Sequence, residues 1–84
     1  MTIKLRENLS TQKLDDKLII LDLDNGVFFE INESGYEIFK LIESNFSYDD
    51  IVNTFAKNNA LNGGTAKNEV DNFLIKLKEN SVIA

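Results

Sequence analysis

NGVFFEINESGYEIFKLI, residues Asn25 to Ile42, is the stretch that decides the fold of this chain. It begins with a turn that ends at Gly26, continues into the short strand VFFEI, and passes abruptly into a capped helix. The stretch lacks the usual catalytic groups. We therefore interpret it as part of a module that binds a partner.

A second strand, Leu18 to Leu23, precedes this stretch and predicts a hairpin with Val27 to Ile31. One register makes Asn25-Gly26 a two-residue turn. That register places Asp22 opposite Phe29, and it brings a carboxylate into an apolar face.

The other register has a three-residue loop, Asp24 to Gly26, with Gly26 in the left-handed conformation of a bulge. It gives the cross-strand pairs Leu23 with Val27, Leu21 with Phe29, and Ile19 with Ile31. The solvated face then carries Ile20, Asp22, Phe28 and Glu30. We prefer this register because it leaves one continuous apolar face.

The first helix follows at once. Its N-cap is either Asn32, or Ser34 with Glu37 three residues later as a capping box. The helix is expected to end near Ser44. Its apolar stripe is Tyr36, Ile38, Phe39 and Ile42.

Two further helices are predicted downstream. Ser47 opens the second helix, which the run from Asn58 to Gly64 stops. Thr65 is expected to cap the third, which runs to about Asn80. The apolar stripes of these two helices are Ile51, Val52, Phe55 and Ala56, and then Val70, Phe73, Leu74 and Leu77.

The two ends of the chain carry weaker signals. Ile3, Leu5 and Leu9 suggest a first strand, followed by a polar turn from Thr11 to Lys17. Val82-Ile83 is apolar and is expected to pack back onto the domain. The predicted fold class is therefore α+β, with a three-stranded antiparallel sheet followed by three helices.

Composition limits the function. At 84 residues and 43% hydrophobic content, we expect residues 1–84 to form a single domain. Cysteine and histidine are absent, which argues against a thiol nucleophile, a common general base and a metal site. A net charge of -5 argues against binding to nucleic acid. With no long apolar segment and no signal-like start, we expect a cytoplasmic protein without membrane contact.

Three segments, taken in order, resemble the PqqD-like family, the leader-peptide recognition elements of pathways that modify ribosomally made peptides. They are FEINESGYEIFKLI, with Ile31 where the family has Leu; FSYDDIVNTF, similar to the family's Ser/Thr-x-x-Glu-Ile helix; and EVDNFLIKLKENSVI, similar to its Val-x-x-Phe-Leu-x-x-Leu pattern. The resemblance covers nearly the whole chain. It implies a winged helix-turn-helix-like fold.

The resemblance also implies a function. The domain would capture the leader of a precursor peptide as an extra strand beside the third strand, in a cleft against the third helix. It would act without catalytic residues, cofactor or metal, and would present the peptide to a separate modifying enzyme or leader peptidase in a lasso-peptide, radical-SAM peptide or PQQ-type pathway. The expected peptide-binding residues are Val27, Phe28, Phe29, Glu30 and Ile31 on the strand, and Lys67, Asp71, Leu74, Ile75 and Lys78 on the helix.

Two other functions stay open at this point. A winged-helix regulator that binds nucleic acid or another protein would need a basic recognition helix, whereas the third helix mixes Lys67 and Lys76 with Glu69 and Asp71. A small acidic carrier domain would need an attachment serine in an Asp-Ser-Leu-like context, and neither ESGY nor FSYD provides one.

Overall fold

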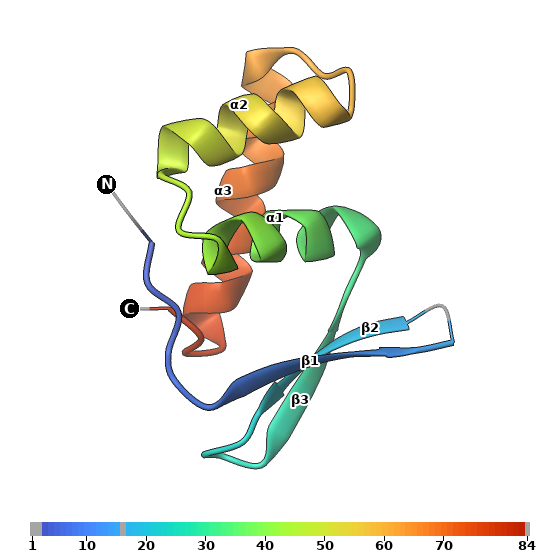
Figure 1. Cartoon of the computed structure of the whole chain (residues 1–84), viewed down its shortest axis with the longest axis vertical. Coiled ribbons are helices and arrows are strands. Elements are labelled where there is room, and N and C mark those ends of the chain that lie inside the picture. The colour runs from blue at the N-terminus through green and yellow to red at the C-terminus, as the bar shows by residue number, and fades with distance from the viewer. Residues whose placement is uncertain (1–2, 16, 84) are drawn as a thin grey trace.

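The computed structural model describes residues 3–15 and 17–83 (Figure 1). Three strands come first and three helices follow, so the predicted order is confirmed. The sheet is antiparallel with strand order β1-β2-β3, and in Figure 1 it lies below α1, with α2 farthest from it. The elements are β1 Leu9–Leu14, β2 Lys17–Asp22, β3 Val27–Ile31, α1 Glu33–Glu43, α2 Tyr48–Asn58 and α3 Gly63–Glu79.

The register of the β2–β3 hairpin differs from both predicted registers. Asp22 pairs with Val27, so the connection has four residues, Leu23 to Gly26, and Gly26 has a φ of 67°. The remaining pairs are Leu21 with Phe28, Ile20 with Phe29, Ile19 with Glu30, and Leu18 with Ile31. Phe28 and Glu30 stay on the solvated face as predicted, but Ile20 and Asp22 lie on the core face and are buried.

Asp22 explains why the preferred register was wrong. Its carboxylate accepts hydrogen bonds from the backbone N–H groups of Asp24 at 3.1 Å and Asn25 at 3.2 Å, and from the Asn25 side chain at 2.8 Å. The Arg6 guanidinium forms an ion pair with it. A carboxylate that is hydrogen-bonded and paired in this way can be buried at acceptable cost. The hydrogen bonds from Asn25 and Arg6 lower the pKa of Asp22.

The first strand begins and ends later than predicted. Residues 11–14, which were expected to form a polar turn, belong to β1, and the connection to β2 spans only positions 15 and 16, of which Asp16 lies outside the described residues. The polar sequence reflects the position of β1 at the edge of the sheet. Leu5 instead forms a bridge with Ile83, and Val82 is buried, so the predicted packing of the C-terminal pair is confirmed.

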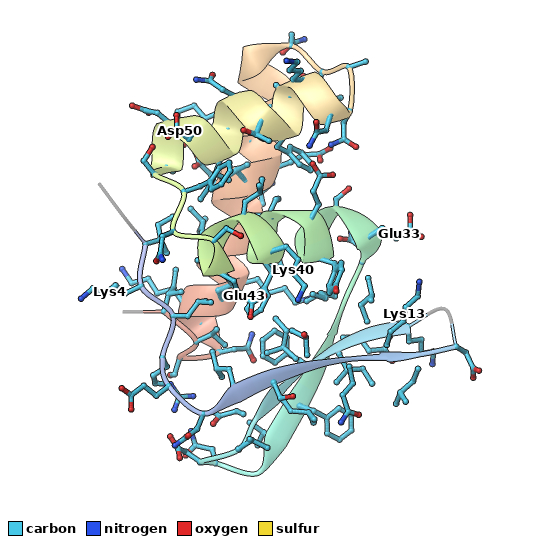
Figure 2. All side chains as sticks on the ribbon, in the orientation of Figure 1. Lys4, Lys13, Glu33, Lys40, Glu43 and Asp50 are labelled. Atoms are coloured by element: carbon cyan, nitrogen blue, oxygen red, sulfur yellow. The ribbon has the colours of Figure 1, made fainter. Side chains whose placement is uncertain are left out.

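Local capping sets the helix starts. Asn32 caps α1, through a hydrogen bond from the Gly35 N–H, and Ser47 caps α2. For α3 the predicted cap was wrong: the Asn62 side chain accepts from the Thr65 N–H at 2.7 Å, so the helix starts at Gly63. Acidic residues, among them Glu33 and Asp50, lie in the first turns of α1 and α2 (Figure 2), where the helix dipole favours them.

One hydrophobic core joins the sheet to the helices. The buried predicted stripe residues are Ile38, Phe39 and Ile42 of α1, Ile51 and Phe55 of α2, and Val70, Phe73 and Leu77 of α3. Leu18, Ile20 and Ile31 of the sheet contact the same cluster. Within the described part of the chain, no helix has both the length and the apolar composition that crossing a membrane requires.

Candidate functional site

The open edge of β3 is the first feature of the candidate site. Among residues 3–15 and 17–83, β2 is the one strand that pairs with β3. The Lys76 Nζ donates to the backbone carbonyl of Glu30 at 3.0 Å, so this carbonyl faces α3 and not β2. In an antiparallel strand, the backbone N–H and C=O groups of successive residues point alternately to one neighbouring strand position and to the other. The backbone groups of Phe28, two residues before Glu30, therefore also point away from β2. The edge therefore offers the N–H and C=O groups of Phe28 and Glu30.

A cleft of about 670 Å³ adjoins this edge. Its walls come from the end of β3, the first turn of α1 and one side of α3, with Lys17 of β2 at the margin. The lining residues are Lys17, Glu30, Ile31, Asn32, Ser34, Gly35, Ile38, Glu69, Asn72, Phe73 and Lys76. Apolar side chains line its base, and polar groups line the remainder.

Gly35 sets how closely α1 approaches α3. A Cβ atom at Gly35 would lie 2.7 Å from a ring carbon of Phe73 and 3.2 Å from Oδ1 of Asn32. Only glycine allows the Phe73 ring to lie against the first turn of α1 while Asn32 caps it. The Asn-x-x-Gly spacing thus shapes the floor of the cleft.

The charges in the cleft are mixed. Lys17 and Glu30 lie 3.5 Å apart as an exposed ion pair. Lys76 has the neutral Glu30 carbonyl as its partner, and within residues 3–15 and 17–83 no carboxylate lies within ion-pair distance of it. Glu69 lies two helical turns away from Lys76, about 10 Å along the axis of α3. The cleft therefore carries both positive and negative side chains and not charges of a single sign.

The predicted strand residues occupy different parts of this site. Glu30 and Ile31 line the cleft, and Ile31 is also part of the core. Phe29 is half-buried against the core. Val27 and Phe28 are exposed at the far end of β3, with 51% and 67% of their surface accessible. All five residues belong to β3, the strand at the open edge of the sheet.

The predicted helix residues lie outside the cleft. Lys67 and Asp71 form an ion pair at 2.9 Å, and Asp71 also accepts from the Tyr48 hydroxyl of α2. These contacts lower the pKa of Asp71, with the Tyr48 hydrogen bond as the main cause, and raise the pKa values of Tyr48 and Lys67. Leu74 packs half-buried beside the core, and Ile75 and Lys78 are exposed. None of the five lines this cleft, and their contact with a peptide stays a prediction.

The cleft instead contains the adjacent side of α3. Glu69, Asn72, Phe73 and Lys76 recur at i, i+3, i+4 and i+7, so they form one stripe that includes a core residue. The helical spacing of α3 identifies its buried apolar side and the residues on either side of it. It does not tell which of these two sets of residues faces β3. Asn32, Ser34, Gly35 and Lys17 were also missed as lining residues; the glycine in a helical first turn was the available signal.

The family model described as coenzyme PQQ synthesis protein D (PqqD) matches residues 17–83. The chain belongs to the PqqD family. The match covers β2, β3, all three helices and hence every wall of the cleft. No curated protein matches the chain.

Two solved structures share the PqqD-family fold seen here. One is TbiB1 in complex with the TbiA(beta) leader peptide, with a TM-score of 0.84 and 21% identity over 95% of this chain and 93% of that one. The other is a lasso peptide synthetase B1 complexed with the leader peptide, with a TM-score of 0.86 and 19% identity over 100% of this chain and 99% of that one. The α+β fold with three strands before three helices is thus confirmed.

Proposed function

We propose that this chain is a single, non-catalytic peptide-recognition domain that captures the leader of a ribosomally made precursor peptide as a fourth strand at β3. The observation that carries the proposal is the open edge of β3 beside a cleft that α3 walls, in a member of the PqqD family. Both similar structures are complexes with leader peptides, which supports the same ligand class here.

Strand addition uses the groups available at this edge. The N–H and C=O groups of Phe28 and Glu30 are spaced as a ladder for one extended peptide. Alternate side chains of that peptide point toward the cleft, about 6.6 Å apart, and meet Ile31, Phe73 and the polar rim. Backbone hydrogen bonds would supply affinity, and the cleft would supply specificity.

The proposed binding residues follow from this arrangement. We retain Val27, Phe28, Phe29, Glu30 and Ile31 as the strand that receives the leader. On α3 we propose the cleft wall of Glu69, Asn72, Phe73 and Lys76 in place of the residues chosen from sequence.

The bound leader would be presented to a separate enzyme. That partner is a modifying enzyme or a leader peptidase of a lasso-peptide, radical-SAM peptide or PQQ-type pathway. We place this step in the cytoplasm, where ribosomal precursors are made. The domain itself supplies recognition and no chemistry.

Calorimetric titration with the leader of a precursor encoded beside this gene tests the proposal. We expect saturable binding, and no binding of a scrambled peptide of the same composition or of duplex DNA. Absence of heat at saturating concentrations for every leader encoded in the neighbourhood would overturn the proposal. Specific retention of an operator fragment would instead favour a regulator.

A further inference from the structure

Lys76 links α3 directly to the open edge of β3. Its ammonium donates to the Glu30 carbonyl, 46 residues away in sequence, and its side chain lines the cleft. This carbonyl is one of the backbone acceptors that an added strand would use. Lys76 is therefore in contact with the position that a bound peptide must occupy.

Lys76 differs from Lys17 and Lys67 in the kind of partner that its ammonium contacts. Lys17 already pairs with the Glu30 carboxylate at 3.5 Å, and Lys67 with Asp71 at 2.9 Å. Lys76 contacts a neutral oxygen only, among the described residues. An ammonium without a counter-charge in a cleft attracts an acidic group of an incoming ligand, since opposite charges pair at such rims.

We infer that Lys76 selects leader peptides that carry an acidic side chain at a cleft-facing position next to the residue paired with Glu30. This inference rests on the proposed function and names the chemistry of the ligand. While the edge is unoccupied, the same ammonium covers the Glu30 carbonyl, and lysine at an open edge also disfavours pairing with a second sheet.

The pleat of the added strand gives the position of that acid. The peptide residue paired with Glu30 sends its side chain to the outer face, where the Glu30 carboxylate pairs with Lys17. The residues before and after it send theirs toward α3, which carries Lys76. A carboxylate at either of these two positions is within reach of the ammonium.

A thermodynamic cycle tests the inference. Fluorescein-labelled synthetic leaders of the neighbouring precursor, with each Asp or Glu replaced in turn by Asn or Gln, are titrated with the wild type and with Lys76→Met, which keeps the stem and removes the charge. We expect one replacement to weaken binding to the wild type by about fivefold at low salt, and to have no effect on binding to Lys76→Met. Lys76→Arg should retain the discrimination.

Lys57→Met is the matched control, because it removes the same charge from an exposed helical position, on α2, that does not line the cleft. It should leave the preference for the acid unchanged. Equal affinity of wild type for the acidic leader and all its amide versions, with binding intact, would overturn this inference alone. If the original leader does not bind the wild type at all, the proposed function fails as well. Increased self-association of Lys76→Met without coupling to the peptide would assign Lys76 a protective role only.

Discussion

The two edges of the sheet differ in sequence and in surroundings. β1 has the sequence LSTQKL, and its second half is exposed to solvent. β3 has the sequence VFFEI, and the cleft and α3 lie beside its end. In Figure 2, Lys13 lies near the tip of the β1–β2 hairpin, which projects beyond α1 in this view.

The backbone groups on the two edges can be compared directly. Ile19 of β2 lies opposite both Glu30 and Gln12. Since the Glu30 backbone faces away from β2, the backbone hydrogen bonds of Ile19 are made with Gln12 of β1. The backbone N–H and C=O groups on the outer edge of β1 then belong to Thr11 and Lys13. Both edges thus have unpaired donors, but only the β3 edge combines them with apolar side chains and a cleft.

Edge strands with exposed apolar side chains promote aggregation, and polar or charged side chains reduce this risk. β1 follows that rule. β3 departs from it, with Phe28 and Val27 exposed, and one lysine from α3 contacts its edge. The proposed addition of a peptide strand at β3 would account for this difference. Four substitutions test this comparison.

Phe73→Ala should have the largest effect. Phe73 is 8% exposed, contacts the core and forms part of the cleft wall, and removing an aromatic core side chain costs about 3–5 kcal/mol of unfolding free energy. Ile75→Ala on the same helix is the control, because Ile75 is exposed and its loss should change stability by less than about 0.5 kcal/mol. Urea unfolding curves measure both. Equal losses would contradict the assignment of Phe73 as the residue that joins the cleft to the core.

Gly35→Ala should have the next largest effect. The new methyl group would meet the Phe73 ring at 2.7 Å, and such overpacking costs roughly 1–3 kcal/mol. Gly64→Ala is the matched change, since its nearest neighbour would be Asn62 Oδ1 at 3.5 Å and alanine favours the helix. We expect Gly64→Ala to be neutral or stabilising in thermal unfolding. A stable Gly35→Ala variant with unchanged leader affinity would show that the cleft floor tolerates a shift of Phe73.

Glu30→Pro compares the two edges directly. Proline removes an N–H group that faces the proposed peptide and not β2. Because about one backbone hydrogen bond to the peptide is lost, leader affinity should fall by about tenfold or more. Lys13→Pro removes the equivalent outward N–H from β1. We expect similar stability for the two variants and full peptide binding by Lys13→Pro only. Amide-shift mapping with the leader should move β3 and the Glu69–Lys76 side of α3. Shifts confined to α2 would mean that the proposed site is wrong.

Asp22→Asn should have the smallest effect on stability, and this effect should depend on pH. The folded-state pKa of Asp22 is lowered from 3.8 by its bonds to Asn25 and Arg6, so its ionised form stabilises the fold above this value and the contribution is lost as pH falls below it. Asp71 acts in the same direction. Asp22→Asn should therefore be less stable than the wild type at neutral pH, and the difference should shrink below about pH 3.8. Urea midpoints at pH 6 and pH 3 measure this, and a constant difference would argue against the ionised carboxylate.

Periodicity and local chemistry were enough to predict several elements. The helical spacing of Ile38, Phe39 and Ile42 marked the buried side of α1. Ser47 was identified as the cap of α2, and Asn32 was one of two caps predicted for α1, because capping acts over three residues. For α3 the same reasoning predicted Thr65 as the cap and missed Asn62, since Gly63 and Gly64 were assigned to the run that stops the second helix and not to the first turn of the third.

Two features depended on contacts between distant residues. Asp22 is buried because Arg6, 16 residues away, and the turn at Asn25 satisfy its carboxylate, and this contact sets the hairpin register. Which side of α3 faces β3 depends on how Phe73 packs against Gly35, 38 positions apart in the chain. Residue spacing specifies the inward face of each element because it reflects the geometry of that element alone. The relative rotation of two packed elements, and the compensation of a buried charge, are properties of both partners together, so only the tertiary structure could supply the cleft.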